Sequence, residues 1–189
     1  MSAKHSIAEK LCLTCGLCCN GVIFADVQLQ NGDDFETLKS LGLPLTKLRA
    51  ATLKTENAAP SAMAKKFSQP CAAFDGCRCR IYADRPKYCG AFECALLKSV
   101  KAGEEETAEA IRIIEKARRR AEKVRQLLRK AGDKDESIAL SLRFRRTMKR
   151  IQRGAIDPQT GAIFSQLSLA VQDLNFLLSE KFYPSSAPD

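Results

Sequence analysis

The chain has 189 residues, which is enough for one ordinary domain or for a small domain with a helical extension. Its hydrophobic fraction of 45% and its mixed charges are typical of a soluble globular protein, and no apolar run approaches the length of a membrane span. The net charge of +9 suits a polyanion or an acidic protein surface as a partner, whereas the absence of Trp leaves few side chains that could stack on bases.

The N-terminal segment and the cysteines predict a cytoplasmic protein. Residues 1–10 contain neither the apolar core nor the cleavage site of a secretory signal. Thiols stay reduced in the cytosol, where clustered cysteines more often bind metal than form structural disulfides. Nine cysteines are also an odd number, which a disulfide framework cannot fully use. We therefore expect reduced, metal-binding cysteines.

The N-terminal half is predicted to contain short elements between two cysteine-rich stretches. A helical turn should precede residue 12, and residues 22–29 are typical of a short strand. The run Asn-Gly-Asp-Asp at residues 31–34 offers a turn and an N-cap for a helix over residues 35–41. Residues 45–66 are weakly patterned, and we expect an irregular connection with one helical turn there.

The second cysteine-rich stretch follows this connection. Asp-Gly at residues 75–76 lies between two short apolar runs, which is a strong hairpin signal. Proline suits the first position of a helix, so a helix is predicted over residues 86–98, although Gly90 weakens it. This helix would carry Cys89 in its first turn.

No cysteine occurs after residue 94, and the pattern beyond Gly103 becomes that of amphipathic helices. The first predicted helix, which ends at residues 131–132, has an apolar stripe spaced by four and three residues: Ala110, Ile114, Ala117, Ala121, Val124 and Leu128. A second helix, capped by Asp133 or Asp135 and ending near Arg153, has the stripe Leu140, Phe144, Met148 and Ile151. A third helix over residues 161–182 has the stripe Phe164, Leu167, Val171, Leu174 and Leu178.

Together these patterns predict an α+β fold in three parts. Residues 1–98 would form a small cysteine-rich metal-binding domain with short strands, a hairpin and helices. Residues 103–183 would form an antiparallel unit of about three helices, because the links between them are short. The tail, residues 184–189, is predicted to be disordered.

The first cysteine-rich stretch has the spacing of a metal-binding loop. Cys12, Cys15 and Cys18 follow C-x2-C-x2-C, as do the first three ligands of ferredoxin-type iron–sulfur loops. The C-x2-C unit is equally that of a zinc knuckle. Gly16 supplies the backbone freedom that a tight loop needs. Adjacent side chains tend to point apart, so Cys18 and Cys19 should serve different partners, which favours two centres or one centre with a nearby free thiol.

The second stretch supplies five further thiols. Cys89 and Cys94 would lie about 140° apart on an ideal helix, so they serve different centres or the chain kinks at Gly90. Cys77 and Cys79 should face the same side of a strand. Four thiolates on Zn²⁺ or on a [4Fe–4S]²⁺ cluster leave a charge of about −2, and two such sites would use eight of the nine cysteines. Four basic residues lie close in sequence and either offset this charge or are merely solvated: Arg78, Arg80, Arg85 and Lys87.

These residues resemble the CxxCxxCC cysteine-cluster family, the YkgJ-type zinc- or iron-chelating proteins. The similarity covers about residues 10–98 and consists of the motifs Cys12-x2-Cys15-Gly16-x-Cys18-Cys19, Pro70-Cys71, Cys79-x-Ile81-Tyr82-x2-Arg85-Pro86-x2-Cys89 and Phe92-x-Cys94. The resemblance implies eight shared metal-binding cysteines: Cys12, Cys15, Cys18, Cys19, Cys71, Cys79, Cys89 and Cys94. It leaves Cys77 as an extra thiol, and Gly90 stands where the family usually has Arg.

A domain of this type also occurs in flagellin lysine methylases, where an iron–sulfur cluster is implied. Nothing outside the cysteine region resembles a methyl-donor site. The single histidine, His5, is expected at the surface rather than as a ligand, and no catalytic triad, P-loop or dinucleotide-binding motif is present.

The predicted helices over residues 112–153 are strongly basic. They carry sixteen Lys or Arg against five Asp or Glu, a local net charge of +11. Clustered cations suit phosphate contacts, so a nucleic-acid or acidic-protein partner at this face is one hypothesis. The solvated outer face of a helical bundle is the favoured alternative.

We therefore expect a metal-binding cysteine-cluster protein with a redox or accessory role, holding either an iron–sulfur cluster of the 4Fe-4S type or zinc. The C-x2-C-x2-C loop favours iron–sulfur. One alternative is a structural zinc module that presents basic helices to a nucleic acid or an acidic protein. Another is an enzyme distantly related to the flagellin lysine methylases, for which the sequence indicates no catalytic residue.

Overall fold

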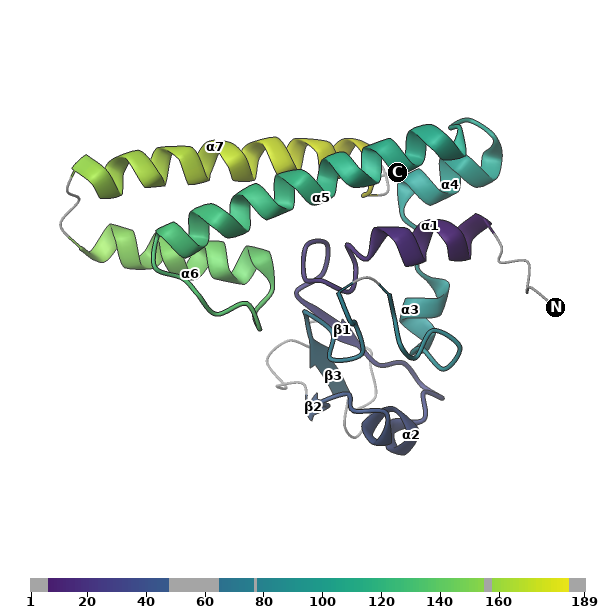
Figure 1. Ribbon diagram of the computed structural model, residues 1–189. Helices are drawn as coiled ribbons and strands as arrows, with labels where there is room; N and C mark the ends of the chain where they lie inside the picture. The colour runs from purple at the N-terminus through teal and green to yellow at the C-terminus, as the bar shows by residue number, and fades with distance from the viewer. Residues whose placement is uncertain (1–6, 48–64, 77, 155–157, 184–189) are drawn as a thin grey trace, which may run out of the picture.

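The computed structural model of the chain describes residues 7–47, 65–76, 78–154 and 158–183. His5, Cys77 and the tail over residues 184–189 lie outside these ranges, so the predictions about them stay predictions. The fold is α+β, as expected. Figure 1 shows long helices lying across a smaller lobe that contains the strands.

The smaller lobe begins with one helix and is built around a three-stranded antiparallel sheet. Its first elements are α1 (Ile7–Cys15), β1 (Asp26–Gln28), α2 (Phe35–Ser40), β2 (Thr46–Lys47) and β3 (Lys65–Ser68). The strand order is β1-β3-β2, and Val27 lies opposite Phe67. The sheet is therefore small, and its central strand is the last of the three in the sequence.

Two sequence predictions for this lobe need correction. The strand predicted over residues 22–29 shrinks to β1, because only three of its residues lie in register with residues of β3. Thr46 and Lys47 pair with β3 instead of starting a helical turn, and β3 begins at the end of the segment predicted to be irregular. The helix predicted over residues 35–41 is confirmed as α2, with the Asp34 carboxylate accepting hydrogen bonds from the Glu36 and Thr37 N–H groups.

The helix predicted over residues 86–98 is two helices, α3 (Lys87–Ala91) and α4 (Ala95–Ala102). The backbone is extended at Phe92 and Cys94, with ψ of 124° and 162°. Phe92 packs edge-on against the Phe24 ring at a centroid distance of 4.8 Å, which gives a physical reason for the break. The predicted hairpin at residues 75–76 is a tight turn closed by one isolated bridge between Phe74 and Cys79.

The C-terminal half consists of α5 (Thr107–Lys130), α6 (Leu140–Arg153) and α7 (Pro158–Lys181). The stripe predicted on α5 is confirmed, because all six of its residues are at most 2% exposed. Helix α7 returns antiparallel to α5 (Figure 1), so that Asp173 pairs with Arg120 at 2.8 Å and the Phe182 carbonyl accepts from the Ala95 N–H.

The second C-terminal helix starts later than predicted, because Asp133 does not act as its N-cap. The Asp133 side chain is buried and accepts hydrogen bonds from Arg143 and Arg146, at 3.2 Å and 2.8 Å from Oδ1. Thr147 donates to the same carboxylate. Since the carboxylate is used to hold the inner face of α6, the helix begins seven residues further on, at Leu140.

Buried apolar residues form two clusters in the described part of the chain. The sheet cluster consists of Val27, Leu29, Leu38, Leu43, Phe67, Cys71, Ala73 and Ile81. The helical cluster joins residues of α4–α7 to three residues from the N-terminal segment: Leu11, Leu17 and Val22. The cysteine loop after α1 therefore shares a core with the long helices. The domain boundary at residues 98–103 stays a prediction.

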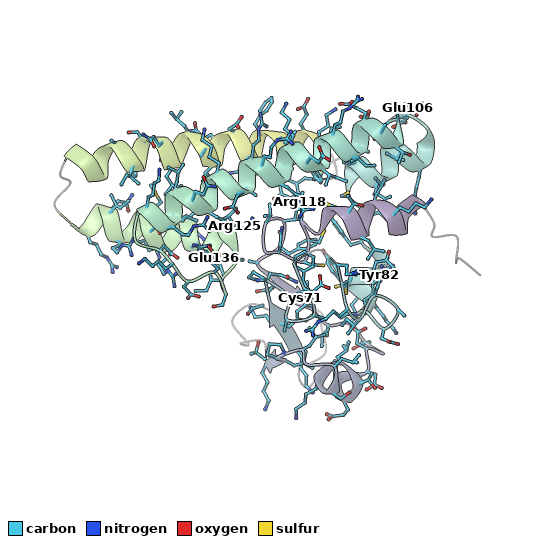
Figure 2. All side chains as sticks on the ribbon, in the orientation of Figure 1. Cys71, Tyr82, Glu106, Arg118, Arg125 and Glu136 are labelled. Atoms are coloured by element: carbon cyan, nitrogen blue, oxygen red, sulfur yellow. The ribbon has the colours of Figure 1, made fainter. Side chains whose placement is uncertain are left out.

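Polar contacts bind the same loop to α5 and α6. Arg118 donates to the Thr14 carbonyl at 2.9 Å and Arg125 donates to the Asn20 carbonyl at 3.3 Å. Figure 2 shows both arginines on the side of α5 that faces the smaller lobe. The Leu140 N–H, at the start of α6, donates to the Gly21 carbonyl. Among the helices that the structure describes, none combines the length and apolarity needed to cross a membrane.

Candidate metal centre

Eight cysteines line a single cavity of about 120 Å³ between the two clusters. They are the eight that the family resemblance implies, and all of them are free thiols. Cys12 is exposed, Cys71 is buried, and the other six are half-buried. The structure thus brings together thiols from the two cysteine-rich stretches, as expected from the sequence.

The first cysteine loop is shaped by Gly16, which directly follows α1. Its φ of +64° lies in the left-handed region, where a glycine has no steric cost. Its carbonyl accepts hydrogen bonds from the Cys19 and Asn20 N–H groups, which turns the chain back beside α1. A Cβ on Gly16 would lie only 2.7 Å from Phe74 Cζ, so a glycine is needed for the two stretches to approach each other. This confirms the role predicted for Gly16.

Four of the thiols form a first set: Cys12, Cys15, Cys18 and Cys94. Burial raises the pKa of Cys15 to about 12, and the nearby sulfur atoms of Cys94 and Cys12 add to this shift. Burial also raises the pKa of Cys18, and the sulfur atoms of Cys15, Cys19, Cys94 and Cys12 add to this shift in decreasing order. Cys15 and Cys94 both pack against the helical cluster. The first set therefore combines the C-x2-C-x2-C motif with one remote cysteine at the start of α4; Cys12 and Cys15 lie on the last turns of α1 rather than in the predicted loop, and only Cys18 follows the helix.

The other four thiols form a second set: Cys19, Cys71, Cys79 and Cys89. Burial, followed by the nearby Cys79, Cys71 and Cys89, raises the pKa of Cys19 to about 12. Burial, followed by Cys71 and Cys79, also raises the pKa of Cys89 to about 12. All four pack in or against the sheet cluster, and the Cys71 N–H donates to the Cys19 carbonyl at 2.8 Å.

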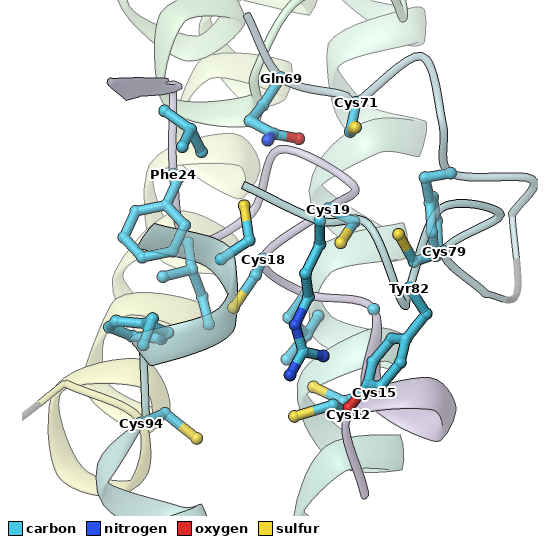
Figure 3. A pocket seen from close by; sticks show the side chains of 18 of the residues that line it. Cys12, Cys15, Cys18, Cys19, Phe24, Gln69, Cys71, Cys79, Tyr82 and Cys94 are labelled. Atoms are coloured by element: carbon cyan, nitrogen blue, oxygen red, sulfur yellow. The ribbon is translucent and has the colours of Figure 1, made fainter. Parts of the chain in front are cut away.

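The adjacent residues Cys18 and Cys19 belong to different sets. In Figure 3 the sulfur of Cys18 lies on the side of Cys94, whereas the sulfurs of Cys19 and Cys79 face each other. Cys89 and Cys94 are likewise divided, because the chain between α3 and α4 is extended rather than helical. Cys18 and Cys19 thus belong to different sets of thiols, and so do Cys89 and Cys94.

The thiols surround a shared space and do not form a closed cage. Within the described ranges, no three Cys, His, Asp or Glu side chains are placed to hold one metal ion. Enclosing a single Zn²⁺ would require sulfur atoms at about 2.3 Å from the metal, and hence side-chain rotations. The donor set itself suits zinc and iron–sulfur clusters, which both prefer thiolate ligands.

Arginine and lysine side chains lie close to the thiols and oppose the effect of burial on their pKa values. Arg85 does so for Cys12 of the first set and for Cys79 and Cys89 of the second. Its guanidinium is centred 3.9 Å from the Tyr82 ring centroid, a cation–π contact that fixes its position. Arg80 acts on the second set alone, whereas Lys101 and Arg118 act on the first.

Of the four basic residues considered in the sequence, Arg80 and Arg85 thus act on the thiols. Lys87 instead binds the chain before α2, since its Nζ donates to the Asn31 carbonyl and its N–H donates to Asp33. The exposed Arg78 lines the cavity.

Sequence reasoning missed several residues of the cavity. Phe24, Tyr88 and Phe92 pack ring against ring and form part of its apolar wall. Phe182, at the end of α7, also lines the cavity, and burial together with the nearby Cys18 raises the pKa of Tyr183. Phe92 belongs to the Phe92-x-Cys94 motif, but no local pattern marks the other aromatics, because segments distant in the chain bring them together.

Gln69 also lines the cavity and was not predicted. Its side chain is 2% exposed, and its Oε1 has no hydrogen-bond partner among the described residues. Figure 3 shows its amide group near Cys71, on the cavity side. A buried amide without a partner is costly, and a group held by the thiols would offer it one. This side chain, like the donor set, fits an occupied cavity.

The fold and the gathered thiols define a thiol-based metal-binding domain. The family model described as "CxxCxxCC: Putative zinc- or iron-chelating domain" matches residues 11–117, more than half of the chain. The chain belongs to this family. Neither a comparison with curated proteins nor one with solved structures finds a significant match.

Proposed function

We propose that the protein holds two metal centres, each bound by four thiolates. The first centre would use Cys12, Cys15, Cys18 and Cys94, and the second would use Cys19, Cys71, Cys79 and Cys89. The observation that carries this proposal is that Cys19, Cys71, Cys79 and Cys89 pack in or against the sheet cluster, whereas Cys15 and Cys94 pack against the helical cluster. Four thiolates are the full ligand set of a zinc ion or of a [4Fe–4S] cluster.

Several features support iron–sulfur clusters over zinc. The first set has three cysteines with C-x2-C-x2-C spacing and a fourth far along the chain, as ferredoxin-type sites do, although Cys12 and Cys15 lie on α1 and only Cys18 lies in the following loop. The thiols surround a cavity of about 120 Å³, whereas a lone zinc ion needs no space beyond its four sulfurs. When bound, such clusters supply one-electron transfer, which suits a redox or accessory role.

The chain's own residues would shield the centres and balance their charge. The rings of Phe24, Tyr88 and Phe92 limit the access of water to the cavity. Two centres with four thiolates each would together carry a charge of about −4, and Arg85 lies near thiols of both. Burial raises the pKa of the thiols, so metal binding at neutral pH releases protons.

Anaerobic purification followed by metal and sulfide quantification tests the proposal. Two [4Fe–4S] clusters would give about eight iron atoms and eight sulfides per chain. The variants Cys15→Ser and Cys79→Ser should each retain about half of the metal, because each removes a ligand of one centre. Cys77→Ser is the matched control and should retain all of it. Equal metal loss in all three variants would overturn the division into two centres.

A structural zinc module is the second candidate. It is favoured by the contacts of the first cysteine loop, whose Thr14 and Asn20 carbonyls accept hydrogen bonds from arginines of α5. A metal that fixes this loop would also fix the long helices above it. About two zinc ions per chain without sulfide would support this candidate over iron–sulfur clusters.

A further inference from the structure

The strongest concentration of positive charge lies on α6. A shallow groove open to solvent runs along the outer face of this helix, from Leu142 at one end to Gly154 at the other. It is lined by five cationic side chains: Arg145, Arg146, Lys149, Arg150 and Arg153. The groove and the cysteine cavity have no lining residue in common.

The basic residues of α5 are largely occupied by partners within the chain. Arg112 and Arg119 pair with Glu109 and Glu115 on the same helix. Four further arginines bind carbonyls or carboxylates of neighbouring segments: Arg118, Arg120, Arg125 and Arg129. Six of the nine cationic side chains of α5 are therefore engaged within the chain, whereas its three lysines have no acidic partner among the described residues.

Helix α6 differs, because it carries six cationic side chains and no acidic one, and three of the cations in its groove have no acidic partner among the described residues. Arg146 and Arg150 bind Asp133 and the Ala131 carbonyl, and so they hold α6 in place. Arg145, Lys149 and Arg153 are exposed and make no such contact. They follow one another at intervals of four residues, so they form a row about 12 Å long on one side of the helix.

We propose that the α6 groove binds the phosphate backbone of a double-stranded nucleic acid. A duplex carries one negative charge per about 1.7 Å of its axis with both strands counted, so the stretch of about 12 Å of duplex beside the row carries roughly seven phosphates, of which about half face the protein. No aromatic side chain lines the groove in the described part of the chain, so base stacking does not contribute. Leu142 is its one apolar residue and is 37% exposed, which is a poor anchor for a protein partner. Binding should therefore depend on charge and shape rather than on sequence.

Fluorescence anisotropy with the full chain and a labelled 20-base-pair RNA duplex tests this proposal. With three to five phosphate contacts, the affinity should fall with salt with a log–log slope of about −3 to −4. The variant Arg145→Gln/Lys149→Gln/Arg153→Gln should make this slope less negative by about 3 units, since each phosphate contact contributes about one unit. Its affinity at low salt should drop at least tenfold.

The matched control is Arg112→Gln/Lys116→Gln/Arg119→Gln, which removes the same charge from an exposed face of α5. This variant should bind the duplex nearly as well as the wild type. An equal loss of binding in both variants, or no binding by the wild type, would overturn the proposal. So would equally tight α6-dependent binding of polyglutamate or of phosphatidylserine vesicles. None of these variants removes a cysteine, so metal content should stay unchanged and failure here would leave the two-centre proposal intact.

Discussion

The sheet lobe and the helical half of this protein have very different amounts of buried apolar surface. Among the described residues, the sheet cluster contains eight buried residues and the helical cluster contains twenty-one. The strands of the sheet have three, two and four residues, whereas α5 and α7 have twenty-four each. A core of eight residues is too small to stabilise a lobe of this size without other cross-links. We therefore expect metal–thiolate bonds to stabilise the first region, whereas apolar packing stabilises the second.

The largest difference in stability between the two regions should appear when the metal is removed. Thiolate centres contribute on the order of 10 kcal/mol to the folding of small domains, so chelation should unfold the sheet lobe while α5 and α7 stay helical. Hydrogen exchange measured by mass spectrometry would report this difference segment by segment. Cys15→Ser should deprotect the N-terminal loop and α4, and Cys79→Ser should deprotect the sheet. Uniform protection of the chain after metal removal would contradict the comparison.

The variant Asp133→Asn should have the opposite effect: it should destabilise the helical half and leave metal binding intact. Asp133 and Arg143 are both buried, and breaking such a pair costs about 3–5 kcal/mol. Thermal unfolding should show the loss, with the metal content unchanged. Asp135→Asn is the control: its exposed carboxylate also contacts Arg146, and its loss should matter little.

The contribution of Asp133 should also depend on pH. Burial alone would raise its pKa, but the hydrogen bonds from Arg146 and Arg143 outweigh burial and lower the pKa below its ordinary value. A carboxyl whose folded-state pKa is lowered stabilises the protein above its unfolded pKa, about 3.9, and this stabilisation is lost as the pH falls through the folded-state value. The difference between wild type and Asp133→Asn should therefore shrink in acid below about pH 4. A difference that stays constant into that range would argue against the ion pair.

A smaller effect is expected where the two cysteine stretches touch. Gly16→Ala combines an unfavourable positive φ with a clash against Phe74, and we expect it to cost about 3 kcal/mol and to reduce metal content. Gly42→Ala has the same backbone strain, at φ +88°, but no atom within 4 Å of the new Cβ. The excess cost of Gly16→Ala over Gly42→Ala in chemical denaturation measures the clash. Equal costs would mean that Phe74 moves freely and that the approach of the two stretches is loose.

The smallest expected effect is a loss of metal affinity when a cationic side chain near the thiols is replaced. Arg85 lies near both sets and Arg80 near one, so Arg85→Gln should weaken metal binding at both centres by about three- to tenfold, whereas Arg80→Gln should weaken only the second. Chelator competition in the Cys15→Ser and Cys79→Ser backgrounds isolates one centre at a time. A loss at the first centre caused by Arg80→Gln would contradict the assignment of these charges.

Much of the local structure was predictable because it depends on short-range patterns. The apolar spacing of α5 predicted its buried stripe from Ala110 to Leu128, and Asp34 marked the start of α2. Cysteine spacing predicted a metal-binding loop with a flexible Gly16, and the family comparison agrees with the zinc- or iron-chelating class. In each case the residues that decide the structure lie within a few turns of one another.

Other features were decided only by contacts between distant segments. The strand β3 has no distinctive pattern of its own and exists because it lies between β1 and β2. The delayed start of α6 follows from the burial of Asp133, which looks like an ordinary helix cap in the sequence. The unpaired amide of Gln69 became recognisable only beside the thiols.

The sequence by itself determined which residues can bind metal, since thiol chemistry and the spacing of Cys12, Cys15 and Cys18 are properties of the chain. Only the tertiary structure decided how the eight cysteines divide. Cys18 and Cys19 are neighbours in the chain, yet the sulfur of Cys18 lies on the side of Cys94, whereas Cys19 packs against the sheet cluster (Figure 3). That separation depends on the path of the backbone after Gly16 and on the break between α3 and α4, and both follow from packing between segments far apart in the sequence.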